Sequence, residues 1–145
     1  EVLPQGEIFL SLPPEGQVWY LSHVWFTEFN WLYEYESAER MMLSSLRVSI
    51  VESFSSYPSD TDIPIRQVLR EITSSQLTDI TQNELDKFML FLDDVVFQPL
   101  ETFGIIEVIE EESEDEIFST LTGIRVSKLG HHILKAQESY FQKRQ

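Results

Sequence analysis

The sequence predicts a mainly α fold with a small β-hairpin, which places the chain in the α+β class. Three features favour this class: a four-residue apolar repeat in residues 37–54, a helix-capping sequence at Thr81, and two β-branched runs around an acidic segment. Apolar residues at helical spacing form one buried stripe, whereas β-branched runs bounded by turn formers favour strands. The 145 residues suffice for one compact domain, or for one domain with an arm.

Residues 1–36 are predicted to form an aromatic-rich arm that packs on a domain formed by residues 37–145. We expect residues 1–14 to be irregular, with a short strand over residues 7–12 that stops at Pro13 and Pro14. Eight of the eighteen aromatic residues fall between Trp19 and Tyr35, in a segment that is helical or irregular. If this segment is a helix, its aromatic residues occupy two faces, and burial on both faces indicates an interaction element.

The next elements are short and alternate in type. Residues 37–54 are predicted to form a helix, residues 55–62 a loop and residues 62–65 a very short strand. A short helix follows over residues 66–73, with Val68 and Ile72 facing inward. The apolar stripe of the first helix consists of Met42, Leu43, Leu46, Ile50, Val51 and Phe54.

A longer helix is predicted to begin at Thr81, whose hydroxyl can accept a hydrogen bond from the amide of Glu84 in a capping box. Pro99 ends or kinks this helix, and Gly104 lets the chain leave. Residues 104–110 and 118–127 are predicted to pair as strands, with the acidic residues 110–116 as the loop between them. Ser127 can cap a last helix, in which Leu129, Ile133, Ala136 and Tyr140 are spaced along one face.

This order of elements resembles the winged helix-turn-helix superfamily over residues 37–141. Residues 62–73 look like the first strand and second helix, residues 81–104 occupy the place of the third helix, and residues 104–127 look like the β-wing. Two local sequences support the likeness. Phe103-Gly104-Ile105-Ile106 precedes the wing, and Ser127-Lys128-Leu129-Gly130 is similar to the Thr-x-x-Gly start of the helix that follows the wing in bacterial regulators. The resemblance implies a winged-helix-like domain with an N-terminal aromatic-rich extension.

The charge distribution departs from that of a DNA-binding winged helix. The net charge is -15, and no Lys or Arg lies between Lys87 and Arg125. Phosphate contacts supply most of the affinity of such domains, and they require basic side chains. We therefore expect neither nucleic-acid binding through the usual face nor binding to an anionic membrane. The predicted third helix instead carries Glu84, Asp86, Asp93, Asp94 and Glu101, and the wing carries seven further acids between Glu107 and Glu116.

The sequence predicts no catalytic, cofactor-binding or metal-binding residue. Cysteine is absent, which excludes disulfides, thiolate zinc sites and a cysteine nucleophile. The chain contains no GxSxG, SxxK, HExxH or glycine-rich phosphate loop. His131 and His132 would point about 100° apart on a helix. The acidic loop lacks both the spaced ligands and the glycine of a calcium-binding loop.

We therefore expect a non-catalytic protein-interaction or dimerisation domain of a bacterial cytoplasmic protein. Because the chain starts at Glu1 rather than at Met, we expect it to be part of a longer protein. Two alternatives stay open. One is a DNA-binding transcription regulator that uses Arg66, Arg70, Arg125, Lys128 and Lys135, and the other is a small-molecule-binding or enzymatic domain with an aromatic pocket. The expected partner is a protein, including a second copy in a homodimer. The candidate partner-binding residues are Trp19, Trp25, Phe26, Phe29, Trp31, Tyr33, Glu110, Glu111, Glu112, Glu114, Asp115 and Glu116.

Overall fold

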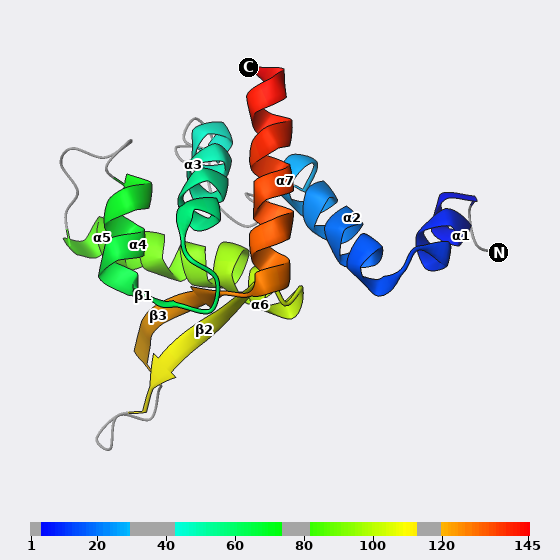
Figure 1. Ribbon diagram of the computed structural model, residues 1–145. Coiled ribbons are helices and arrows are strands. Elements are labelled where there is room, and N and C mark those ends of the chain that lie inside the picture. Colours follow the sequence, from blue (N-terminus) through cyan, green and yellow to red (C-terminus); the bar gives the residue numbers. More distant parts are fainter. Residues whose placement is uncertain (1–3, 30–42, 74–81, 113–119) are drawn as a thin grey trace.

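The computed structural model describes residues 4–29, 43–73, 82–112 and 120–145 (Figure 1). Within them the chain is mainly helical with a small antiparallel sheet, which confirms the predicted α+β class. The elements are α1 (Pro4–Ser11), α2 (Pro14–Thr27), α3 (Leu43–Ser56), β1 (Asp62–Pro64), α4 (Ile65–Thr73), α5 (Gln82–Phe91), the π-helical turn η2 (Leu92–Phe97), α6 (Gln98–Thr102), β2 (Ile106–Glu111), β3 (Thr120–Val126) and α7 (Lys128–Arg144).

The sheet has three strands in the order β1-β3-β2, all antiparallel. The predicted hairpin and the predicted short strand are therefore confirmed, and the short strand pairs with the second arm of the hairpin. Arg125 lies on the central strand opposite Asp62 of β1 and Glu107 of β2. It forms ion pairs with these residues at 2.6 Å and 3.0 Å. Opposite charges directly across a sheet stabilise the pairing of the strands.

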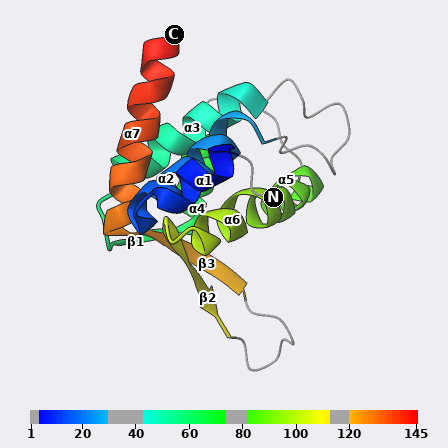
Figure 2. The same cartoon turned by 90° about the vertical axis from the view of Figure 1, so that its right-hand side faces the viewer.

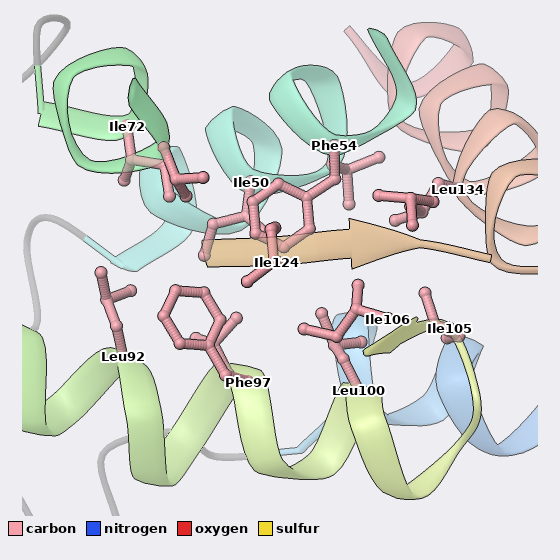
Figure 3. Packing of buried hydrophobic residues seen from close by; sticks show 14 of the residues in the cluster. Ile50, Phe54, Ile72, Leu92, Phe97, Leu100, Ile105, Ile106, Ile124 and Leu134 are labelled. Atoms are coloured by element: carbon pink, nitrogen blue, oxygen red, sulfur yellow. The ribbon is translucent and has the colours of Figure 1, made fainter. Parts of the chain in front are cut away.

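The core lies between the sheet and the helices. Figure 3 shows side chains of α3 and of the η2–α6 segment converging from opposite sides on Ile124 of β3. The predicted stripe of α3 is confirmed for Leu46, Ile50 and Phe54, whose exposures are 3%, 0% and 0%. Phe54 stacks on Phe97 of η2 with ring centroids 6.4 Å apart. Complete burial of such side chains contributes about 1.5–3 kcal/mol each.

The helix before the wing passes through Pro99 without ending. Proline has no N–H and its ring crowds the carbonyl of the residue four positions earlier, so an ideal α-helix is disrupted there. The chain accommodates Pro99 with η2, in which the amide of Gln98 bonds to the carbonyl of Asp93, five residues earlier. One helical turn, α6, then follows, and Gly104 leaves it with a φ of 74°. Of the two predicted effects of Pro99, ending the helix is wrong, because α6 contains Pro99 and follows the π-helical turn directly.

The strand predicted over residues 7–12 is wrong, because residues 4–11 form the helix α1. An isolated strand leaves its backbone groups without partners, whereas a helix pairs them locally. The two prolines also act differently from the expectation. Pro13 is the N-cap of α2 and Pro14 is its first residue, a position where the missing N–H has no cost.

The inward face of α7 differs from the predicted face by one residue. Ser127 caps the helix as predicted, and its hydroxyl accepts the amide of Gly130 at 2.9 Å. Ala136, predicted to be buried, is exposed, while Gln137 is fully buried. Apolarity alone favours alanine over glutamine for an inward position, but Gln137 is retained inside by a contact with α2. The predicted capping box at Thr81 lies outside the described residues.

A buried tyrosine links the end of α3 to α4 and makes stability sensitive to high pH. The Tyr57 hydroxyl donates to the Glu71 carboxylate at 2.5 Å. Burial, together with this hydrogen bond and the Glu71 charge, raises the pKa of Tyr57 above its ordinary value. The folded state therefore holds the phenol proton more tightly than the unfolded state, whose pKa is about 10. This contribution is complete below that pH and is lost as the pH rises above it.

We expect Tyr57→Phe to lower the free energy of unfolding by about 1 kcal/mol at neutral pH, the typical value of one hydrogen bond. Urea unfolding of both proteins should show this difference narrowing between about pH 9 and about pH 11, as the wild-type phenol becomes costly to bury. A difference that stays constant over this range would contradict the assignment.

Candidate protein-interaction surface

The helix α2 is attached to the domain by its buried face. Trp25 and Phe26 are 7% and 0% exposed and belong to the main core. The Trp25 ring also contacts the edge of Phe103, just after α6, with centroids 6.4 Å apart. Two of the candidate partner-binding residues, Trp25 and Phe26, therefore attach the arm instead of offering surface to a partner.

A second attachment lies at the carboxyl end of α2. The Arg47 guanidinium of α3 donates to the carbonyls of Phe26 and Thr27 at 3.2 Å and 3.3 Å, and also to that of Phe29. The last carbonyls of a helix lack partners within it and carry partial negative charge. Partial burial lowers the pKa of Arg47, but a guanidinium stays protonated in proteins. Arg47 therefore caps α2 from the neighbouring helix.

A polar contact fixes α2 to α7. His23 Nδ1 lies 3.0 Å from Oε1 of the buried Gln137. The imidazole stacks on Trp19 with centroids 4.9 Å apart and meets the edge of Tyr140 at 4.6 Å. Within the described residues, Gln137 Nε2 is buried without a hydrogen-bond partner. Periodicity could not have found this contact, because it joins polar side chains that are 114 positions apart in the chain.

The other sides of α1 and α2 expose apolar residues. Phe9 contacts Tyr20 with centroids 5.7 Å apart, which joins the two helices. Figure 2 shows both helices on one side of the molecule, toward the viewer. We call the exposed apolar residues of these helices the arm surface: Ile8 (65%), Leu10 (65%), Trp19 (39%), Tyr20 (43%) and Leu21 (44%). Exposed apolar residues thus concentrate on these two helices, whereas monomeric proteins rarely expose large apolar patches.

Of the other candidate residues, the structure describes Phe29, Glu110, Glu111 and Glu112, and none of these belongs to the arm surface as defined. Phe29 is 52% exposed just beyond α2. Glu110, Glu111 and Glu112 are exposed at the far end of β2, in the hairpin that projects from the helices in Figure 1. The remaining candidates lie outside the described residues: Trp31, Tyr33, Glu114, Asp115 and Glu116. Sequence reasoning missed Ile8, Leu10, Tyr20 and Leu21, whose exposure depends on how α1 and α2 dock.

A second exposed surface runs along α5 and η2. Asp86 and Asp94 are exposed and Asp93 is partly buried on this segment. Burial raises the pKa of Asp93, a side-chain hydrogen bond from Gln98 opposes that rise, and the negative charges of Asp94, Glu110 and Glu101 add to it. The charge of Glu110 on β2 is thus felt at Asp93.

The histidines of α7 separate as predicted, with His131 partly buried and His132 exposed. Among residues 4–29, 43–73, 82–112 and 120–145, no three His, Asp or Glu side chains gather as a possible metal site. In the same part of the chain, no helix combines the length and apolar content needed to cross a membrane.

Comparisons with known proteins assign no family to the chain. No protein-family model, curated protein or solved structure matches it. Function is therefore inferred from the chain's own surfaces and contacts.

Proposed function

We propose that the chain is a non-catalytic winged-helix-like domain that forms a homodimer through the arm surface. One observation carries the proposal. Five large apolar side chains are 39–65% exposed on two helices, and the longer of these helices is anchored to the core. Since α2 is held by Phe26, Arg47 and His23, the α2 part of the arm surface is presented in a fixed position. A preorganised apolar surface loses little entropy when it binds.

A second copy of the chain is the partner that fits this surface best. Among the described residues, Leu90 is the one large exposed hydrophobic residue beyond Phe29. No other described part of the chain offers comparable apolar surface to cover the arm. A two-fold contact between two copies covers the exposed arm surface, because each arm surface then buries the equivalent surface of the partner copy.

The winged-helix part of the proposal is supported by the element order and by the strand order β1-β3-β2. The local pairing of several basic residues favours protein interaction over DNA binding. Arg125 forms ion pairs with Asp62 and Glu107, and Lys128 lies 3.9 Å from Asp60. Lys135 lies 3.3 Å from Glu138. Three of the five bases named for phosphate contacts thus meet carboxylates of the same chain. The absence of cysteine supports a cytoplasmic location.

Light scattering after size-exclusion chromatography tests the dimer. We expect the wild-type chain to elute as a dimer and the double variant Leu10→Asp/Leu21→Asp to elute as a monomer. Carboxylates at two buried interface positions should raise the dimer Kd by at least about 30-fold, the effect of losing one interface hot spot.

Leu90→Asp is the matched control, since Leu90 is 64% exposed and lies outside the arm. This variant should elute like the wild type. A wild-type chain that stays monomeric at the highest soluble concentration would contradict the proposal, as would a double variant that still dimerises with circular dichroism matching the wild type.

A further inference from the structure

Leu90, on the outward face of α5, is an exposed apolar residue that does not belong to the arm surface. Leu90 is 64% exposed, although the same helix is held firmly by its other side. Phe91 and Leu92 are 6% and 0% exposed, and Phe88 stacks on Phe91 with centroids 6.3 Å apart. The exposure of Leu90 is therefore set by the register of a packed helix.

The neighbours of Leu90 on this face are acidic. Asp86 precedes it by four residues in α5, and Asp93 and Asp94 follow it in the π-helical turn η2. Lys87 precedes Leu90 by three residues and adds one positive charge to this border; it is the one basic residue in the sequence of α5, η2 and α6. The result is an apolar centre with an acidic border.

We propose that this Leu90 face binds a basic amphipathic helix of a partner protein. An apolar anchor surrounded by charged residues is the usual plan of an interaction site, with the anchor supplying affinity and the border supplying specificity. Here the border is negative, so the complementary segment needs two features. It carries an apolar residue that contacts Leu90, and it carries Lys or Arg one helical turn before and after that residue. Basic side chains would also relieve the repulsion among Asp93, Asp94 and Glu110.

The arm of a second copy does not fit the Leu90 face. Its exposed acids are Glu7, Glu15 and Glu28, and no Lys or Arg precedes Arg40 in the sequence. The two surfaces would therefore bring like charges together, which disfavours the contact. A nucleic acid is excluded for the same reason, because its phosphates would meet the carboxylates. The Leu90 face is thus distinct from the proposed dimer contact.

Fluorescence anisotropy with the full chain tests this inference. The probe is a labelled synthetic helix with leucine on one face and lysine on the other, and its control has the same composition in scrambled order. We expect saturable binding of the amphipathic probe, at least about 10-fold weaker binding of the scrambled one, and a loss of about 10-fold for Leu90→Ser, equivalent to about 1.4 kcal/mol.

A matched pair of charge variants separates a site from general attraction to an acidic protein. Asp86→Asn/Asp93→Asn/Asp94→Asn should weaken probe binding by at least about 10-fold more than Glu7→Gln/Glu15→Gln/Glu28→Gln, which removes the same charge from exposed positions of the arm. The dimer variant Leu10→Asp/Leu21→Asp should bind the probe normally, so either proposal can fail without the other. Equal losses from the two triple variants, an unchanged affinity of Leu90→Ser, or no saturable binding would overturn the inference.

Discussion

Gly130→Ala is expected to lower the free energy of unfolding by about 3 kcal/mol, the upper range for overpacking in a tight site. A Cβ at this position would lie 2.0 Å from the carbonyl oxygen of Ile105. That carbonyl cannot move aside easily, because it accepts the amide of Ser127 at 3.0 Å. Ser127 also donates its hydroxyl to the Gly104 carbonyl at 2.7 Å. The first turn of α7 is thus fastened to the turn that leads into β2.

Urea denaturation followed by circular dichroism measures the effect. Gly16→Ala in α2 is the matched control, since its Cβ would meet Leu12 and Pro13 at ordinary distances of 3.4 Å or more. That variant should be neutral or stabilised by up to about 1 kcal/mol, the helix propensity difference between glycine and alanine. If Gly130→Ala is insoluble, Ser127→Ala tests the same junction through the cap, at a cost of about 1 kcal/mol. Equal stabilities of Gly130→Ala and the wild type would contradict the close contact.

Local sequence signals correctly predicted the residues that join the start of α7 to the turn before β2. Gly104 was expected to let the chain leave its helix, and it adopts a φ of 74° that disfavours other residues. Ser127 was expected to cap the last helix, and it does so through Gly130. Both signals act within a few residues, so they hold without knowledge of the tertiary fold. The stripe of α3 and the pairing of the hairpin strands were predictable for a related reason, because one face of each must be buried.

Features that depend on distant contacts were not predictable. The apolar run in residues 7–12 suits a strand as well as a helix, and none of the three strands that the structure describes pairs with it, so its backbone groups bond within α1. Gln137 faces inward because His23, on another helix, meets its amide oxygen. The residues of the candidate surface were likewise not predictable from the sequence. The aromatic segment indicated an interaction element, but the docking of α2 determines that Trp25 is buried while Tyr20 and Leu21 are exposed.

Phe26→Ala is expected to cost about 4 kcal/mol, within the range for deleting a fully buried aromatic side chain. The Phe26 ring packs edge-on against Trp25 at 5.0 Å and is fully buried at the junction of the arm with the core. The cavity left by alanine cannot close easily, because the Phe26 carbonyl is also held by Arg47. Leu90→Ala, at an exposed position outside the arm surface, should change stability by less than about 0.5 kcal/mol.

The Phe26→Ala variant also tests whether the arm unfolds separately or together with the rest of the domain. All three tryptophans, Trp19, Trp25 and Trp31, belong to residues 1–36, so their fluorescence reports on the arm. Circular dichroism reports on the helices of the whole chain. Because Trp25 and Phe26 share the core with α3 and η2, we expect both probes to give one coincident transition in the wild type and in Phe26→Ala. A fluorescence transition at lower urea than the dichroism transition would show that the arm unfolds alone, and the arm surface would then lack the fixed position that dimerisation requires.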